Sequence, residues 1–174
     1  TPLSVILVNT ANGTRTIINR KAKARGVKID AAALARLNPQ IMLFDGHEPD
    51  ASLLALETFP KATTILDAGS LRPGTRLLAA KVDYLIASER FALQITGLSD
   101  LDAGGQWKDC LKQLAKINPG HIIVTRGEKG LIYYTPATGG TDCFQLPAFP
   151  VTAIDTTGAG DIFHGAFTYG LLQK

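Results

Sequence analysis

The stretch TTILDAGSLRPGTRLLAAKVDYLIASERFALQI, residues 63–95, decides the fold class of this chain. Its short apolar runs are typical of strands buried on both faces, and each run is followed by a segment with helical spacing. The expected elements are a strand over Thr63–Leu66, a helix that starts at Pro73 and continues over Thr75–Ala80, a strand over Asp83–Ala87, and a helix over Glu89–Ile95 with Ser88 as its N-cap. Strands that alternate with helices predict a mainly parallel sheet with helices on both faces.

The same alternation extends outward on both sides of this stretch, and it changes to antiparallel hairpins at the two ends. Upstream we expect strands over Ser4–Thr10 and Thr14–Asn19 joined by an Asn12-Gly13 turn, a helix over Ala31–Leu37 capped by Asp30, a strand over Ile41–Phe44, and a helix over Ala51–Phe59 capped by Asp50. Downstream we expect a helix over Gly105–Ile117, a strand over His121–Thr125, a hairpin of Leu131–Tyr134 and Thr141–Leu146 around Pro136–Gly140, and a final helix that begins within Thr157–Asp161. No linker divides the chain, so residues 1–174 are predicted to form one α/β domain.

Composition and charge exclude several classes of protein. Hydrophobic residues make up 45% of the 174 residues and charged residues 19%, which is typical of a globular domain. The net charge of +3 is dispersed along the chain, so neither nucleic acid nor a membrane surface is an expected partner. No apolar run approaches the roughly 18 residues that a membrane span needs.

The first residues and the cysteines indicate a cytoplasmic protein. The chain opens with Thr-Pro-Leu-Ser, which is neither a starting Met nor a signal peptide, so we expect a piece of a longer polypeptide. Cys110 and Cys143 lie far apart in the sequence and are expected to be reduced thiols. No cluster of His, Cys and Asp has the spacing of metal ligands, so we expect no structural zinc.

The stretch DTTGAGDIFHGAF, Asp155–Phe167, carries the candidate chemistry. Gly158-Ala159-Gly160 puts small residues at a loop-to-helix junction, where unpaired N–H groups and the helix dipole form a site suited to phosphate. Asp161 lies in the first turn beside this site, where a carboxylate can accept the proton of an attacking hydroxyl. A second interpretation remains open at this point, namely that Asp161 complements the helix dipole and the glycines form a tight turn.

Helical spacing divides the side chains of this last helix between two sides. An apolar stripe is predicted to dock on the sheet, and it consists of Ile162, Phe163, Ala166, Phe167 and Leu171. The opposite side is predicted to hold Asp161, His164, Gly165 and Thr168. His164 therefore follows Asp161 by one turn and could contact a substrate or orient the carboxylate.

Two upstream segments have features of a phosphate or nucleotide site. Thr125-Arg126-Gly127-Glu128-Lys129-Gly130 follows a strand, and its glycines allow a tight bend at the strand's carboxyl end, where α/β sheets bind ligands. No Gly-Lys-Ser/Thr follows, so this is not a Walker A loop. Arg15 could clamp a phosphate with its guanidinium, or it could be a solvated strand residue.

Taken whole, Asp155–Phe167 resembles the C-terminal signature of the ribokinase (PfkB) family of carbohydrate kinases, in which Asp-Thr-x-Gly-Ala-Gly-Asp opens the helix that bears the catalytic aspartate. Thr125–Gly130 resembles the family's Thr-x-Gly-x-x-Gly nucleotide loop. Asn12–Ile17 is similar to the Asn-Gly-x-Arg-Thr-Ile of ketohexokinase-like members, and Gly160–Ala166 is similar to the corresponding string of sulfofructose and related ketose kinases.

This resemblance implies a three-layer, Rossmann-like ribokinase fold that is incomplete at both ends. It implies an ATP-dependent kinase that uses Mg²⁺ to phosphorylate a hydroxyl of a ketose or a ketose derivative, and a homodimer for the full-length protein. The implied roles are Asp161 as catalytic base, Gly158, Ala159 and Gly160 as anion hole, Thr125, Gly127, Gly130 and Ser88 as ATP contacts, Arg15 as a phosphate clamp, His164 with Asp161 at the sugar, and the carbonyls of Asp155 and Thr157 as ligands of a monovalent cation such as K⁺.

The chain departs from the family pattern at Ser88-Glu89-Arg90-Phe91, where many members have Asn-x-x-Glu, which organises Mg²⁺ and phosphate through water. Glu89 would replace that glutamate only if the local backbone re-aims it. The family's N-terminal lid, its Gly-Gly sugar motif and its C-terminal adenine-enclosing helices have no counterpart in residues 1–174. We therefore expect these residues alone to have little kinase activity, because positioning carries most of phosphoryl-transfer catalysis.

Two other functions fit the same fold. One is a non-catalytic nucleotide- or sugar-binding module, and the other is a nucleoside or vitamin kinase of the same superfamily. The changed Ser88–Phe91 segment favours the binding module slightly, whereas the intact Gly158–Asp161 string favours a kinase strongly, because a binder has no need of Asp161.

Overall fold

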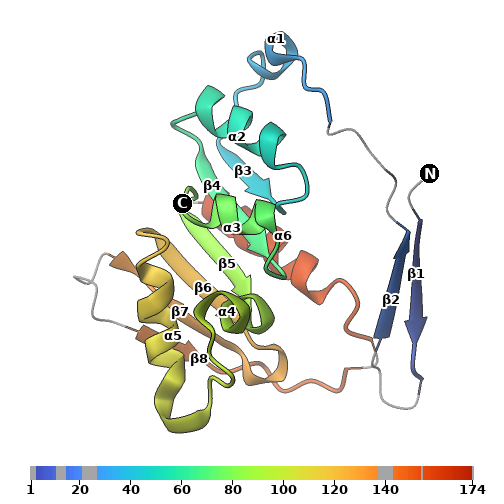
Figure 1. Ribbon diagram of the computed structural model, residues 1–174, viewed down its shortest axis with the longest axis vertical. Helices are drawn as coiled ribbons and strands as arrows, with labels where there is room; N and C mark the ends of the chain where they lie inside the picture. The colour runs from blue at the N-terminus through green and yellow to red at the C-terminus, as the bar shows by residue number, and fades with distance from the viewer. Residues whose placement is uncertain (1–2, 11–14, 21–26, 137–142, 154, 174) are drawn as a thin grey trace.

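The computed structural model describes residues 3–10, 15–20, 27–136, 143–153 and 155–173 (Figure 1). The strands are β1 (Leu3–Val8), β2 (Arg15–Arg20), β3 (Ile41–Phe44), β4 (Thr63–Ala68), β5 (Tyr84–Ser88), β6 (His121–Thr125), β7 (Leu131–Tyr134) and β8 (Cys143–Leu146). The helices are α1 (Ala31–Leu34), α2 (Pro49–Thr58), α3 (Pro73–Ala79), α4 (Glu89–Thr96), α5 (Gln106–Ala115) and α6 (Ala159–Leu172), with 3-10 turns η1 (Ala103–Gly105) and η2 (Gly127–Lys129).

The main sheet has six strands in the order β3-β4-β5-β6-β7-β8. Strands β3 to β6 are parallel, whereas β7 and β8 run antiparallel to their neighbours. The predicted mainly parallel sheet is therefore confirmed. Because β3 to β6 are parallel, the loops that follow them all leave at one edge of the sheet, and that edge is where α/β proteins bind ligands.

The two faces of the sheet carry different layers. On one face, alternate strand residues such as Leu66, Leu85 and Ile122 pack with Phe91 of α4 and Leu111 of α5 in a fully buried core. Helix α6 covers part of the other face, and Figure 1 shows α4 and α5 in front of the sheet with α6 behind it. This is the three-layer arrangement expected from the sequence.

Local signals placed most helix starts correctly. Asp30 caps α1 by accepting hydrogen bonds from the amides of Ala32 and Ala33, and Ser88 caps α4 by accepting one from the Phe91 amide. The cap predicted for α2 was wrong. Glu48 is the N-cap residue, and Asp50 lies inside the first turn. The helix begins at Pro49 because proline lacks an N–H and its fixed φ suits the first helical position.

Strands β1 and β2 form a separate two-stranded antiparallel sheet. Val8 pairs with Arg15 and Leu3 pairs with Arg20, as expected for a hairpin. The predicted Asn12-Gly13 turn lies outside the described residues, as does most of the predicted Pro136–Gly140 turn. None of the helices in the described part of the chain has both the length and the apolar character that crossing a bilayer requires.

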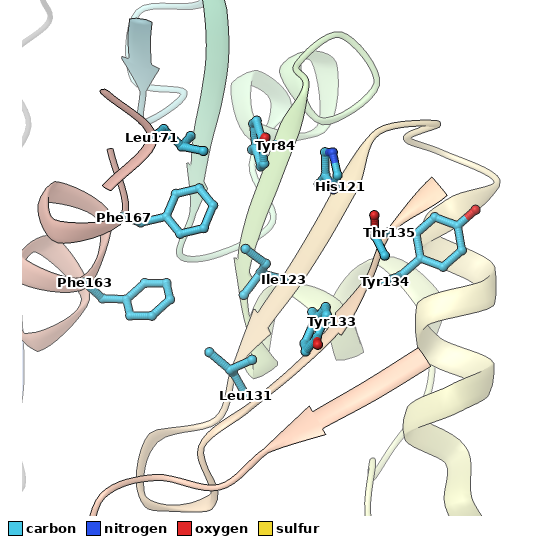
Figure 2. A pocket seen from close by; sticks show the side chains of 10 residues that line it. All are labelled: Tyr84, His121, Ile123, Leu131, Tyr133, Tyr134, Thr135, Phe163, Phe167 and Leu171. Carbon is cyan, nitrogen blue, oxygen red and sulfur yellow. The ribbon is translucent and has the colours of Figure 1, made fainter. Parts of the chain in front are cut away.

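An apolar groove of about 470 Å³ lies between α6 and strands β5 to β7 (Figure 2). Figure 2 shows Phe163, Phe167 and Leu171 of α6 facing the sheet, as predicted. Phe167 meets Tyr84 edge to face at 5.4 Å between ring centroids. The remaining side chains of the groove are His121, Ile123, Leu131, Tyr133, Tyr134 and Thr135.

The predicted division of α6 into two sides was wrong at three positions. Ile162 is 72% exposed and Ala166 is exposed, so neither docks on the sheet, whereas His164 is the buried residue of the helix. The stripe that meets the sheet repeats every four residues through Phe163 and Phe167. His164 stands about 100° around the helix on one side of that stripe, toward β4, and Ile162 stands on the solvent side.

Candidate active site

The loop before α6 turns into the helix through a left-handed glycine. Gly158 is the N-cap residue with φ 77°, and no side chain caps its helix. The Ala159 amide already donates to the Thr156 carbonyl at 3.2 Å, whereas the amides of Gly158, Gly160 and Asp161 have no hydrogen-bond acceptor among the described residues. The open donors of this helix start are thus those of Gly158, Gly160 and Asp161, and Ala159 can serve as a donor only if its present bond opens.

The Asp161 carboxylate is exposed to solvent beside these amides. A Cβ atom placed on Gly158 would lie 3.7 Å from Asp161 Oδ2, so the carboxylate stands directly over the bare backbone. Asp161 also lines a cavity of about 430 Å³ whose polar residues are Asp45, Ser52, Asp67 and His164. The cavity is at the carboxyl ends of β3 and β4, so the side chain faces a ligand-accessible space and not the core.

His164 is buried between α6 and β4, with a side chain that is 7% exposed. Its Nδ1 lies 2.6 Å from the Gly160 carbonyl and 3.5 Å from Asp67 Oδ2. Because a carbonyl oxygen only accepts, Nδ1 must carry the proton. Nε2 is buried and has no hydrogen-bond partner among the described residues, so it is available to accept a hydrogen bond from a ligand or water.

Asp67 is held in an environment that favours its neutral form. Burial raises the pKa of its carboxyl above the ordinary value of 3.8, and the negative charges of Asp161 and Asp45 raise it further, while His164 acts in the opposite direction. Carboxylates from β3, β4 and α6 therefore interact across one cavity. A perturbed carboxyl in a cavity of this kind is typical of functional sites.

The raised pKa of Asp67 predicts how stability depends on pH. A carboxyl with a higher pKa in the folded than in the unfolded chain reduces stability as the pH rises through the folded pKa, and this cost is absent below the ordinary value of 3.8. Asp67→Asn removes the cost. We therefore expect the variant to melt at a higher temperature than the parent at neutral pH and at the same temperature near pH 3, in circular dichroism melts. A lower melting temperature at neutral pH would show that the Asp67 carboxylate is stabilised overall by His164.

A second polar chain borders the same edge of the sheet. His47 donates from Nδ1 to Asp45 Oδ2 at 2.9 Å, and its Nε2 accepts from Arg72 Nη1 at 2.6 Å. Arg72 also donates from Nε to Ser70 Oγ at 3.1 Å. This arrangement holds the side chain of Asp45 next to the cavity.

The loop after β6 has the tight bend predicted from its glycines. Gly127 and Gly130 have φ values of 59° and 83°, and η2 closes through a bond from the Gly130 amide to the Gly127 carbonyl at 3.0 Å. A Cβ atom on Gly130 would lie 2.1 Å from the Leu146 carbonyl oxygen, so only glycine fits there. Thr125 ends β6 opposite Ser88 of β5, and this loop thus lies at the same sheet edge as the cavity but two strands further along.

The remaining predicted contacts are those of Ser88, of Asp155 and Thr157, and of Arg15. The Ser88 hydroxyl donates to the Gly69 carbonyl at 2.8 Å and accepts from the Phe91 amide, so its proton is not available for a phosphate oxygen. Asp155 and Thr157 are exposed and form a local turn, in which the Thr157 amide donates to Asp155 Oδ1 at 2.8 Å. Arg15 begins β2, and its side chain lies outside the described structure.

Comparison with known proteins identifies the family. The model of the pfkB family of carbohydrate kinases matches residues 3–174. This chain belongs to that family. The PfkB-family assignment agrees with the fold, since the solved structure of a ribokinase from Thermotoga maritima superposes on 98% of the chain with a TM-score of 0.71 at 24% identity.

Relatives of this PfkB-family chain include kinases that are named for different acceptors. A ribokinase of Lactococcus lactis is 38% identical over 138 residues, which are 78% of this chain and 41% of the relative. A cytidine kinase of Thermococcus kodakarensis is 34% identical over 95 residues, which are 55% of this chain and 31% of the relative. The chain spans less than half the length of these relatives and about 56% of the Thermotoga structure.

Two residues of this PfkB-family site had only a weak signal in the sequence. Asp67 comes directly after the apolar run Thr63–Leu66, and Asp45 comes directly after the run Ile41–Phe44. The rule that ligands bind at the carboxyl ends of parallel strands would have pointed to both. It could not show that they share a cavity with Asp161, because that depends on how α6 docks on the sheet.

Proposed function

We propose that the protein carrying this chain is an ATP-dependent carbohydrate kinase that transfers the γ-phosphate of ATP to a hydroxyl of a sugar, with Asp161 as the catalytic base. The observation that carries the proposal is the exposed Asp161 carboxylate beside the open amides of Gly158 and Gly160, at a polar cavity on the ligand-binding edge of the sheet. A module that only binds its ligand has no use for a carboxylate in this position.

The proposed reaction needs one proton transfer and one phosphoryl transfer. The acceptor hydroxyl gives its proton to the Asp161 carboxylate while its oxygen attacks the γ-phosphorus. The bond from the γ-phosphorus to the bridging oxygen breaks, and ADP leaves with that electron pair. Amides of Gly158 and Gly160 donate to the oxygens of the transferring group, where the positive end of the α6 dipole also favours negative charge.

His164 lines the same cavity as Asp161. Its Nδ1 proton is committed to the Gly160 carbonyl, which fixes the ring, and its Nε2 can accept a hydrogen bond. An acceptor hydroxyl of the sugar, or a water that touches it, has the donor that Nε2 lacks. We therefore place the sugar hydroxyls in the cavity of Asp45, Asp67, Asp161 and His164.

Metal ions are expected to take most of their ligands from ATP and water. Mg²⁺ would neutralise the charge that develops on the phosphates, and in such sites it is commonly held by one or two carboxylates together with phosphates and waters. Asp67 faces the same cavity as Asp161 and suits this role, whereas no group of three or more metal-ligating side chains occurs in the described part of the chain. We also propose a monovalent cation at the carbonyls of Asp155 and Thr157.

The nucleotide is proposed to lie along the loop after β6. Thr125, Gly127 and Gly130 offer a hydroxyl and closely approachable backbone at the sheet edge, and Arg15 would reach a phosphate from the separate hairpin. Ser88 lies between this loop and the cavity. Its hydroxyl proton is committed to Gly69, so Ser88 would accept hydrogen bonds from the nucleotide or from water and would not donate to phosphate.

For the acceptor we propose a ketose or a ketose derivative, as the Asn12–Ile17 and Gly160–Ala166 strings suggest. The ribokinase and cytidine kinase among the relatives make an aldose and a nucleoside the competing acceptors. The test is sugar-dependent release of ADP by the full-length protein with a panel of ketoses, aldoses and nucleosides. Turnover with one class identifies the acceptor. Absence of turnover with every class, together with measurable ATP binding, would favour a binding module over a kinase.

A further inference from the structure

A cluster of four charged side chains joins the β6–β7 loop to the rest of the sheet edge, outside the cavity of Asp161. Arg126 donates from Nε and Nη2 to Glu89 Oε1, both at 3.2 Å, and a second bond from Nη2 goes to Asp102 Oδ1. Lys129 donates from Nζ to Asp102 Oδ2 at 2.6 Å. One guanidinium thus connects the first turn of α4 with the segment that precedes η1.

The arginine is much more deeply buried than the two carboxylates that it contacts. The side chain of Arg126 is 1% exposed, whereas those of Glu89 and Asp102 are 28% and 50% exposed. A buried guanidinium needs its carboxylates, because an unpaired charge is far more costly there than at the surface. Burial alone would lower the pKa of Arg126, but hydrogen bonds with Asp102 and Glu89 raise it, and the bonds from Arg126 and Lys129 hold the pKa of Asp102 below its ordinary value. Arg126, Lys129 and Asp102 are therefore charged at neutral pH.

The backbone of Arg126 closes the loop that the side chain anchors. Its amide donates to the Gly130 carbonyl at 2.8 Å, and its carbonyl accepts from the Lys129 amide at 3.2 Å. Thr125 and Gly127 are its immediate neighbours, and Gly130 is packed against the backbone of Leu146. Any movement of the guanidinium would therefore move the loop that presents Thr125, Gly127 and Gly130.

The same contacts show what Glu89 does in this chain. Glu89 starts α4 directly after Ser88, at the position where a carboxylate could have compensated for the missing Asn-x-x-Glu. Its Oε1 is instead committed to the buried Arg126, and Phe91, which stands where the pattern has its glutamate, is fully buried in the core. Glu89 Oε1 is therefore occupied by Arg126, and Phe91 has no metal-binding group.

We propose that Arg126 is a positioning residue for the nucleotide, and that Glu89 serves as its counter-ion and not as an organiser of Mg²⁺. The carboxylates of Glu89 and Asp102 hold the guanidinium, and the guanidinium holds the Thr125–Gly130 loop in the shape that meets ATP. This inference rests on the proposed nucleotide site. Removing the charge on either side of the Arg126–Glu89 pair loosens the loop and weakens ATP binding while the chemistry at Asp161 is left in place.

The test compares Glu89→Gln and Arg126→Met with the parent full-length protein. We expect both variants to raise KM for ATP about tenfold, with kcat and KM for the acceptor changed less than threefold, and to leave the free Mg²⁺ concentration for half-maximal rate unchanged. Calorimetric titration with a non-hydrolysable ATP analogue should show the same loss of affinity. That titration does not depend on turnover, so it still tests the loop if the proposed kinase activity is absent.

A control variant on α5 and a second Arg126 variant accompany this test. Asp109→Asn removes an exposed carboxylate that pairs with Lys112 on α5, so it should leave every constant unchanged. If Arg126→Met does not fold, Arg126→Lys keeps the charge without the fork and should give an intermediate KM for ATP. A normal affinity for the nucleotide in the folded Arg126 variants would overturn the positioning role. A higher Mg²⁺ requirement in Glu89→Gln with unchanged ATP affinity would assign Glu89 to the metal instead.

Discussion

Replacing Asp161 by alanine is expected to lower kcat by about three orders of magnitude, because the variant loses the group that takes the proton of the acceptor hydroxyl. The carboxylate is exposed in the first turn of α6, so its removal should leave the fold and the packing of the helix intact. Affinity for the ATP analogue should stay within a few-fold of the parent, since the amides of Gly158 and Gly160 remain. Sugar-dependent ADP release and calorimetric titration measure the two effects separately.

Asp50→Asn is the matched control for Asp161. Asp50 is also exposed in the first turn of a helix, α2, so its removal costs the same kind of interaction with the helix dipole without touching the cavity. This variant should turn over at the parent rate. Equal turnover by the Asp161 variant and the parent would remove Asp161 from its assigned role and leave the helix-dipole interpretation.

Replacing Gly130 by alanine is expected to destabilise the protein by about 3 kcal/mol or more, because a steric clash adds to backbone strain. Gly130 has φ 83° and ψ −129°, a conformation that favours glycine, and the new Cβ would lie 2.1 Å from the Leu146 oxygen and 2.6 Å from the Ala148 amide nitrogen. Both atoms belong to backbone, so they cannot rotate away. Urea unfolding followed by circular dichroism gives the free energy of unfolding.

Gly97→Ala is the control that measures the cost of backbone strain without a steric clash. Gly97 also has a positive φ, 73°, at the C-terminus of α4, but a Cβ there would meet nothing within 4 Å. Its loss of stability should be about 1 kcal/mol, the cost of the left-handed conformation alone. Similar losses at both positions would mean that the segment after β8 moves aside, and the close packing of the loop would then have no part in holding the nucleotide site.

The amino-acid sequence by itself determined the elements and the chemical character of the site. Apolar runs placed the strands of the parallel sheet, Asp30 and Ser88 marked two helix starts, and the glycines before Asp161 marked the junction where amides stay open. These features follow from interactions between residues a few positions apart, so the local pattern is enough to specify them. The same locality explains the error at Asp50, where proline and not the acidic residue sets the first turn.

Only the tertiary structure decided which of these elements meet. The cavity joins residues at the end of β3, in β4 and in the first turns of α6. The Arg126 cluster joins α4, the segment before η1 and the loop after β6. His164 was predicted on the side of α6 opposite the stripe that docks on the sheet, and it is instead buried against Asp67. Such contacts depend on the strand order and on the rotation at which a helix docks. Both are set by the packing of many side chains at once, and no short stretch of sequence encodes them.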